Sequence, residues 1–479
     1  MSEIKNLEPK IVWEQFYNLT QTPRPSKKEE KAVEYLINFA KENNFSYDKD
    51  SSNNVIIRKD ASKGCENKES IVIQNHIDMV CEKNDDTEFN FDTDPIETYI
   101  DGEWVTAKGT TLGADNGIGA AMGLAILLDK DLKHGPLEVL FTTDEEEGMG
   151  GAIGLSKDFI KSRKMINIDT EEEGAIYIGC AGGKSTTFDA KFDEVEVEGI
   201  SYNVSVKGLL GGHSGLMIDQ QLGNAIKLLA RVLVKLKCEG KFLHIVSLNG
   251  GDKHNAIPRE AGCKLILGNA IDKDAISKEF TQIFRNELKG IDEGVEVKIS
   301  DGENYKRCLC FEDSMRVVDL ILAIPHGVQS YSKEIHGLVE SSTNLASFNI
   351  KNGELSMVSS QRSSVSSKVT EVSDSVKACG NLAGVNVETG DGYPAWQPNF
   401  DSDLVKKSGD IYKKLFNKEV GVKVIHAGLE CGLLSEKYPD MEMISVGPDI
   451  TGAHSPDESL KISSVKNVYT FVRELVESL

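Results

Sequence analysis

The 479-residue sequence has no apolar run long enough to cross a membrane. Its longest apolar stretch, from about Gly117 to Leu128, is far shorter than the ~18 residues that a membrane span requires. The first residues, MSEIKNLEPKIVWEQF, lack the apolar segment of a secretory signal, and their acidic side chains argue against a mitochondrial address. We therefore expect a cytoplasmic protein.

The sequence also lacks a disulfide framework and a basic surface. Its nine cysteines are scattered singly, apart from Cys308 and Cys310, and none forms a CxxC pair, so we expect reduced thiols. The 54 Lys and Arg residues against 76 Asp and Glu residues give a net charge of −22, with no local basic patch. Because such a chain repels phosphate and anionic lipid, neither nucleic acid nor a membrane is an expected partner.

What remains is the composition of an ordinary globular protein, with 39% apolar and 27% charged residues. The length predicts two or three domains. Apolar β-branched runs at 55–57, 71–73, 139–142 and 165–168 alternate with helical patterns. One helical pattern, at 26–43, opens with the capping-box spacing of Ser26 and Glu29. This alternation predicts an α/β domain in which helices flank a mixed sheet with parallel strands.

From about residue 201 the pattern becomes strand, helix, strand, strand, helix and strand, ending near residue 299. That order is typical of a ferredoxin-like module. A similar pattern recurs at 315–387 and indicates a second, diverged lobe, so the module is predicted to be duplicated. After the turn-rich segment 391–400 the α/β pattern returns. We therefore predict a discontinuous α/β domain, residues 1–186 and 389–479, interrupted by an inserted α+β domain at 187–388.

Metal-binding residue types follow several predicted strands and loops of the α/β domain. Each segment alone has a plain structural explanation: a hydrogen-bonded histidine, a helix N-cap, a solvated acidic loop or a turn. Together they favour one site, because ligands bind at the carboxyl ends of the strands in open α/β sheets. The segments are NHIDMV with His76 and Asp78, GTTLGADNGIG with Asp115, TTDEEEGMGG with Glu145 and Glu146, NIDTEE with Asp169, and GAHSPDE with His454.

Nitrogen and carboxylate ligands without thiolate suit zinc, cobalt or manganese, and their number is sufficient for two ions. Two divalent ions activate a water molecule and polarise a carbonyl group. In a working model, three carboxylates and a bridging hydroxide balance the charge of two ions, and His76 and His454 are neutral. Glu145 then remains to accept the proton of the water, and Asp78 is well spaced to orient His76.

These segments resemble, as a set, those of the two-metal exopeptidases that include carboxypeptidase G and aminoacylase, and specifically their aminoacyl-histidine dipeptidase branch. The resemblance covers essentially the whole chain. It implies that Glu145 is the general base, that Asp78 orients a ligand, and that Glu147 is a solvated neighbour. It implies two divalent ions, zinc first and cobalt or manganese as alternatives, held by His76, Asp115 as the bridge, Glu146, Asp169 and His454.

Four further candidates are His213 in GLLGGHSG, Asn255 in KHNAIPRE, Arg362 in SSQRSS and Glu430 in HAGLECG. Their plain explanations are a loop histidine, a turn asparagine, a surface arginine and a buried ion pair. The resemblance implies instead that the inserted domain is a lid, in which His213 stabilises the oxyanion and Asn255 and Arg362 bind substrate. Arg362 would bind the C-terminal carboxylate, since a guanidinium matches two carboxylate oxygens, and Glu430 would face the ammonium group.

The function that this resemblance implies is a metal-dependent dipeptidase acting on unblocked dipeptides, including Xaa-His substrates such as β-alanyl-histidine. A hydroxide bridging two metal ions would attack the peptide bond, with a glutamate as general base. We expect small peptides as substrates and a homodimer. Alternatives are an N-acyl amino acid deacylase or a tripeptidase of the same fold, or a non-catalytic metal- or peptide-binding protein. A dinuclear phosphoesterase is disfavoured because the motif segments contain mainly acids.

Overall fold

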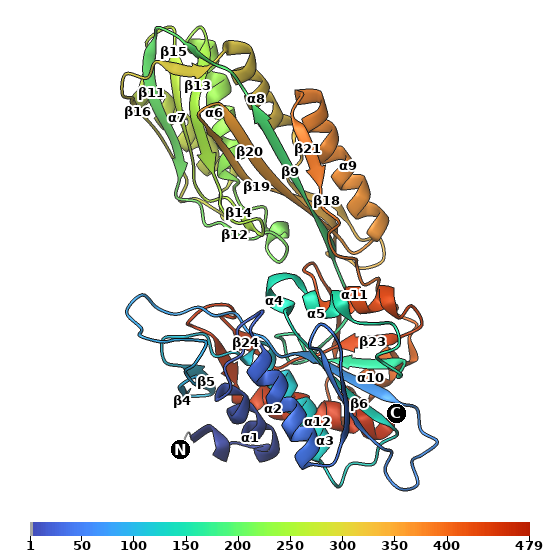
Figure 1. The fold of residues 1–479 in the computed structure, drawn as a ribbon. Coiled ribbons are helices and arrows are strands. Elements are labelled where there is room, and N and C mark those ends of the chain that lie inside the picture. The colour runs from blue at the N-terminus through green and yellow to red at the C-terminus, as the bar shows by residue number, and fades with distance from the viewer. Residues whose placement is uncertain (1–2) are drawn as a thin grey trace. The chain divides into compact units, whose positions relative to one another are not determined.

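The computed structural model describes residues 3–479, which form two compact units (Figure 1). Unit 1 contains the described residues through Cys180, together with Trp396–Val424 and Leu429–Leu479. Unit 2 contains Ala181–Ala395 and Ile425–Gly428. Among residues 3–479, no helix is both long and apolar enough to span a bilayer.

Unit 1 is built on an eight-stranded sheet in the order β1-β2-β6-β3-β7-β23-β8-β22. The four central strands, β6, β3, β7 and β23, are parallel, whereas β1, β2 and β8 run antiparallel to their neighbours. The predicted mixed sheet is therefore confirmed. The bounds are β1 (Ser46–Lys49), β2 (Val55–Lys59), β3 (Ile71–His76), β6 (Leu137–Thr142), β7 (Lys164–Asn167), β8 (Ala175–Cys180), β22 (Gly421–Ile425) and β23 (Glu442–Ser445).

Helices flank this sheet, and α3 (Ala114–Leu128) is buried along almost its whole length. Its glycines allow close packing: a Cβ atom at Gly119 would lie 2.2 Å from the Ile168 carbonyl oxygen, and one at Gly123 would lie 2.8 Å from Val139. The other helices of the unit are η1 (Glu3–Asn6), α1 (Lys10–Thr20), α2 (Glu30–Glu42), α4 (Glu145–Gly148), α5 (Gly150–Gly154), α10 (Asp403–Phe416), α11 (Glu430–Lys437) and α12 (Ile462–Ser478).

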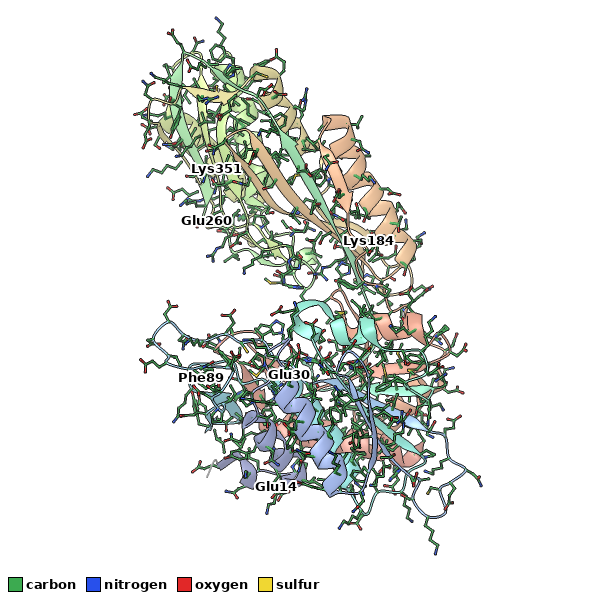
Figure 2. The ribbon with its side chains drawn as sticks, viewed as in Figure 1. Glu14, Glu30, Phe89, Lys184, Glu260 and Lys351 are labelled. Atoms are coloured by element: carbon green, nitrogen blue, oxygen red, sulfur yellow. The ribbon has the colours of Figure 1, made fainter. Side chains whose placement is uncertain are left out.

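The predicted capping box of α2 is wrong, because the helix begins at Glu30, which Figure 2 labels. Ser26 Oγ instead donates a hydrogen bond to Asp78 Oδ2 at 2.8 Å. Glu29 Oε1 accepts the backbone N–H of Asp144 at 3.0 Å. Ser26 thus binds a distant residue, and Glu29 Oε1 accepts the N–H groups of both Asp144 and the neighbouring Lys27, the latter at 2.7 Å.

A small four-stranded sheet, in the order β24-β25-β5-β4, completes unit 1. It pairs a segment near the C-terminus with a hairpin near residue 100, so it joins two distant parts of the chain. Its strands are β4 (Thr98–Asp101), β5 (Trp104–Ala107), β24 (Ile450–Thr451) and β25 (Ser459–Lys461).

Unit 2 contains a long sheet whose first half follows the chain order β11-α6-β13-β15-α7-β16 and the sheet order β16-β11-β15-β13. This order and this all-antiparallel pairing define a ferredoxin-like module. Its elements are β11 (Ile200–Lys207), α6 (Ala225–Glu239), β13 (Leu243–Gly250), β15 (Ala261–Leu267), α7 (Lys273–Glu287) and β16 (Glu296–Asp301).

The second half repeats the module with the chain order β9-α8-β19-β20-α9-β21 and the sheet order β21-β9-β20-β19. Strands β13 and β19 hold the same position in the two modules, and they pair antiparallel to make one sheet and one core. The new elements are β9 (Gly182–Lys191), α8 (Phe311–Ala323), β19 (Val339–Lys351), β20 (Glu354–Ser363), α9 (Ser366–Ala383) and β21 (Asn386–Thr389).

Candidate metal centre and active site

Two groups of ligand-type side chains in unit 1 share the carboxylate of Asp115. His76 Nε2, at the end of β3, lies 3.1 Å from Asp115 Oδ1 and 3.2 Å from Asp169 Oδ1. His454 Nε2 lies 3.2 Å from Asp115 Oδ2 and 3.1 Å from Glu146 Oε2. Each oxygen of Asp115 thus belongs to a different group, which is the arrangement of a bridging carboxylate.

The chemistry of this cluster fits bound divalent metal ions. His76, Asp115 and Glu146 each offer a ligand atom, and these atoms lie within 4.8 Å of one another. Glu146 Oε1 is buried and has no hydrogen-bond partner among residues 3–479. A donor set of imidazole nitrogen and carboxylate oxygen suits zinc, cobalt or manganese. The cluster could therefore bind metal through atoms such as Glu146 Oε1, which has no hydrogen-bond partner in the described part of the chain.

The electrostatics of the cluster point the same way. Burial lowers the pKa of His76, but the charge of Asp169 and the hydrogen bond with Asp115 outweigh it and hold the pKa well above its ordinary value. Hydrogen bonds with Asp115 and Glu146 raise the pKa of His454 to about 11. The clustered carboxylates thus stabilise positive charge at this place, and divalent cations would provide that charge instead of protons on the histidines.

Asp78 links the first histidine to the acidic segment that follows β6. His76 Nδ1 lies 3.3 Å from Asp78 Oδ1, as an ion-pair contact rather than an aligned hydrogen bond. The Asp78 carboxylate also accepts the backbone N–H groups of Glu145 and Glu146, both at 3.1 Å. It is fully buried, so it fixes the histidine ring and the start of α4 together.

The three glutamates of α4 have different surroundings. Loss of solvent raises the pKa of Glu145 well above its ordinary value, and the negative charges of Asp169 and Glu146 add to this shift. Glu147 is exposed and forms an ion pair of 2.7 Å with Lys27. Only Glu145 and Glu146 therefore lie in the electrostatic environment of the cluster.

A buried carboxylate, Glu458, holds the loop that carries Asp115. It accepts the backbone N–H groups of Leu112, Gly113, Ala114 and Asp115 at 2.7, 2.8, 2.7 and 3.1 Å. Sequence reasoning did not select Glu458, although its place four residues after His454 in GAHSPDE was a usable signal.

Arg24, which is 2% exposed, holds the same loop from another direction. Its guanidinium donates hydrogen bonds to the carbonyl oxygens of Ile77 and Asp78 at 3.0 Å and to that of Gly113 at 2.5 Å. Arg24 lies outside every motif, so no signal in the sequence singled it out. Together, Glu458 and Arg24 connect three of the segments that carry the cluster.

Glu430, at the start of α11, is fully buried. Its Oε2 accepts hydrogen bonds from Gln74 Nε2 and Thr142 Oγ1, both at 2.6 Å, and Gln74 Oε1 in turn accepts one from Asn167 Nδ2 at 2.6 Å. Burial raises the pKa of Glu430 to about 8. Its other oxygen, Oε1, has no hydrogen-bond partner in the described part of the chain. Neutral side chains thus bind one oxygen of this carboxyl group, and the other oxygen remains without a hydrogen bond.

The remaining candidates lie in unit 2. Strands β12 (Gly212–His213) and β14 (Ala256–Ile257) pair, and the Ser214 N–H donates to the Asn255 carbonyl at 2.8 Å, so His213 and Asn255 are neighbours. Both line a cavity of about 690 Å³. A Cβ atom at Gly215 would lie 3.1 Å from the His213 ring and 3.3 Å from Arg362 Nε, so the His213 loop also lies against Arg362.

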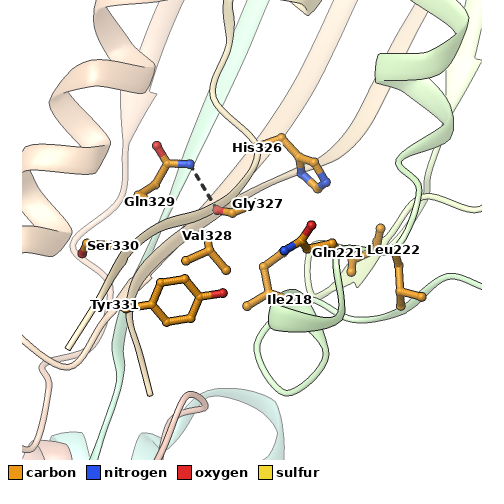
Figure 3. Close-up of a pocket in the computed structure, with 10 residues that line it drawn as sticks. Ile218, Gln221, Leu222, His326, Gly327, Val328, Gln329, Ser330 and Tyr331 are labelled. Atoms are coloured by element: carbon orange, nitrogen blue, oxygen red, sulfur yellow. Dashed lines mark hydrogen bonds between the residues drawn. The ribbon is translucent and has the colours of Figure 1, made fainter. Parts of the chain in front are cut away.

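A second cavity of unit 2, of about 420 Å³, lies beside β18 (Gly327–Tyr331) (Figure 3). Apolar side chains such as Ile218, Leu222 and Val328 line it together with polar ones such as His326 and Tyr331. The residues that line it do not include any of the candidates predicted from the sequence.

A model of the peptidase family M20/M25/M40 matches residues 72–478 of this chain. The chain belongs to this family, and it is a peptide hydrolase. It is 41% identical to the cytosol non-specific dipeptidase of Escherichia coli (strain K12) over 100% of this chain and 99% of that protein. The motif-based resemblance is thereby confirmed.

Solved structures agree with this assignment. The structure of aminoacylhistidine dipeptidase from Vibrio alginolyticus matches with a TM-score of 0.88 and 40% identity, covering 100% of this chain and 98% of that one. Aminopeptidase PepT from Bacillus cereus ATCC 10987 matches with a TM-score of 0.58 and 13% identity, covering 98% of each chain, which shows a shared fold alone.

Proposed function

We propose that this chain is a metal-dependent dipeptidase that hydrolyses unblocked dipeptides, Xaa-His substrates included. The observation that carries the proposal is the sharing of Asp115 between the His76 and His454 groups, with Glu145 beside them. The names of the two relatives, cytosol non-specific dipeptidase and aminoacylhistidine dipeptidase, support the substrate class. A cytoplasmic location and a homodimer are parts of the same proposal.

Five residues would hold two divalent ions. His76 and Asp169 would bind one, His454 and Glu146 the other, and Asp115 both, as their distances suggest. Zinc suits this donor set first, with cobalt or manganese as alternatives. Two such ions, when bound, lower the pKa of a water molecule and polarise the scissile carbonyl group.

Glu145 would act as the general base. It would accept the proton of the attacking water and deliver it to the leaving amine, because it is the carboxylate of the cluster left outside both ligand groups. Asp78 would keep the His76 ring oriented, because it is buried and 3.3 Å from Nδ1.

Unit 2 would act as the lid, and its substrate-binding residues come from the predicted insertion 187–388. His213 would stabilise the developing oxyanion, and Asn255 would bind a polar group of the substrate. Arg362 would bind the C-terminal carboxylate, and the buried Glu430 would receive the ammonium group at the other end. Recognition of both charged ends would favour dipeptides over longer peptides.

The test is hydrolysis of Leu-Gly, β-alanyl-histidine and their N-acetylated forms by metal-stripped protein, with and without Zn²⁺, Co²⁺ or Mn²⁺. We expect cleavage of the free dipeptides only, restored by metal. Cleavage of only the acetylated forms would make the protein a deacylase, and tight metal binding without any cleavage would make it a binding protein.

A further inference from the structure

Four residues form one row across the sheet of unit 2. Ser342 of β19 is opposite Arg362 of β20, and Arg362 is opposite Gly183 of β9, beside Lys184, which Figure 2 labels. Gly183 in turn pairs with Tyr393, since each backbone N–H donates to the carbonyl oxygen of the other at 3.0 and 2.9 Å. Tyr393 is therefore two positions from Arg362 along the row.

The missing side chain of Gly183 lets the Tyr393 ring reach across β9. A Cβ atom at Gly183 would lie 2.7 Å from Tyr393 Oη and 2.8 Å from Cζ, closer than carbon atoms pack. The ring occupies the place that a side chain at residue 183 would take, and Arg362 Nη1 donates a hydrogen bond to Tyr393 Oη at 2.6 Å. The position of the Tyr393 ring thus depends on the absence of a side chain at Gly183.

The hydrogen-bond partner of Arg362 is the phenol of Tyr393, a group without negative charge. A carboxylate at the same place would orient the guanidinium but also neutralise its charge. Within residues 3–479, Arg362 forms no ion pair, and its Nε atom, although buried, has no hydrogen-bond partner. Arg362 is 9% exposed. The phenol therefore holds the guanidinium in place without neutralising its positive charge.

We propose that Tyr393 is the positioning residue that makes Arg362 selective for a free C-terminal carboxylate, and that Gly183 is required for it. The proposal rests on the proposed function, in which Arg362 binds that carboxylate. A guanidinium without the phenol would sample several rotamers, so its paired donors would meet the two carboxylate oxygens less often.

The test compares Leu-Gly with its C-terminal amide, which lacks the negative charge. In Tyr393→Phe, we expect the KM for Leu-Gly to rise about tenfold with kcat within about twofold, as for loss of one hydrogen bond to a charged group. The kcat/KM for the amide should change less than about twofold. Gly183→Ala should reproduce this pattern, because its Cβ displaces the phenol.

A matched control is Tyr202→Phe, which removes a hydroxyl in the same unit that accepts the backbone N–H of Ile271 at 3.4 Å. It should leave both substrates unaffected. A double-mutant cycle adds the mechanism: in an Arg362→Met background, Tyr393→Phe should have no further effect, because the residue acts only through Arg362.

Three results would overturn the proposal: equal losses for free and amidated substrate, a loss in kcat alone, or additive effects in the cycle. Each of these leaves dipeptidase activity of the wild-type protein intact, so it refutes the role of Tyr393 alone. Failure of the wild-type protein to cleave Leu-Gly would refute the proposed function, and the role of Tyr393 with it.

Discussion

Glu458 accepts the backbone N–H of Asp115 at 3.1 Å, and in doing so it connects the two loops that carry Asp115 and His454. The carboxylate spans four consecutive N–H groups, so it holds the backbone of the Asp115 loop rather than a single side chain. Removing one of its oxygens should therefore disturb the distance between the two groups of candidate metal ligands.

Glu458→Gln should weaken metal binding about 10- to 100-fold, as substitutions behind metal ligands do. The glutamine amide keeps one acceptor oxygen. Its NH₂ group would face the two backbone N–H groups that donate hydrogen bonds to the other oxygen in the wild type, and donors repel one another. Titration calorimetry with Zn²⁺ on the metal-stripped chain measures this directly.

The control for that experiment is Glu442→Gln, at the far end of β23. Glu442 also accepts a backbone N–H, that of Leu404 at 3.0 Å, but it does not belong to the cluster. Its substitution should leave zinc affinity unchanged. Equal zinc affinities for wild type and Glu458→Gln would contradict the role of Glu458.

Asp115→Asn should weaken binding of both metal ions, whereas Asp169→Asn should weaken binding of one. The reason is geometric, because Asp115 contributes an oxygen to each group, whereas Asp169 contacts His76 and not His454. Metal content per chain after dialysis distinguishes the two variants. Retention of one full equivalent by Asp115→Asn would rule out the bridge.

Glu145→Gln should lower kcat by about a thousandfold, within the range for loss of a general base. Its metal content should be unchanged, because Glu145 is outside both ligand groups. Glu147→Gln is the matched control two residues further along the chain, and it should change kcat less than about twofold because Glu147 is exposed and paired with Lys27. Similar losses of kcat in the two variants would disprove the assignment of Glu145, and not Glu147, as the general base.

His426 should make the protein less stable as pH falls below 7. Burial, with the charges of Arg362 and His213, lowers its pKa to about 3, against ~6.5 in the unfolded chain. Between these values the unfolded state binds more protons, so the free energy of unfolding decreases as pH decreases. At pH 5 the loss from this group is about 2 kcal/mol relative to pH 7.

Urea denaturation of the full chain and of His426→Asn at pH 7 and pH 5 isolates this effect, since other groups titrate equally in both proteins. The stability advantage of the wild type should shrink by about 2 kcal/mol between the two pH values. An advantage that stays constant would show that His426 is not buried in its neutral form.

The predicted α/β fold and peptide-hydrolase class depended on patterns that local chemistry makes visible. The apolar run 71–73 is continuous because β3 is buried on both faces, and all six residues of this strand are buried. The start of α2 was predicted wrongly for the opposite reason: Ser26 and Glu29 make hydrogen bonds with Asp78 and Asp144, which are distant in sequence.

The sequence by itself determined which atoms are available at the site, because ligand chemistry depends on residue type: imidazole and carboxylate at the ends of apolar strands. Only the tertiary structure decided that Asp115 lies between two histidines, that Glu458 and Arg24 hold its loop, and that Tyr393 reaches Arg362 over Gly183. These contacts join residues that are far apart along the chain. Their geometry depends on packing and strand register, which no local pattern records.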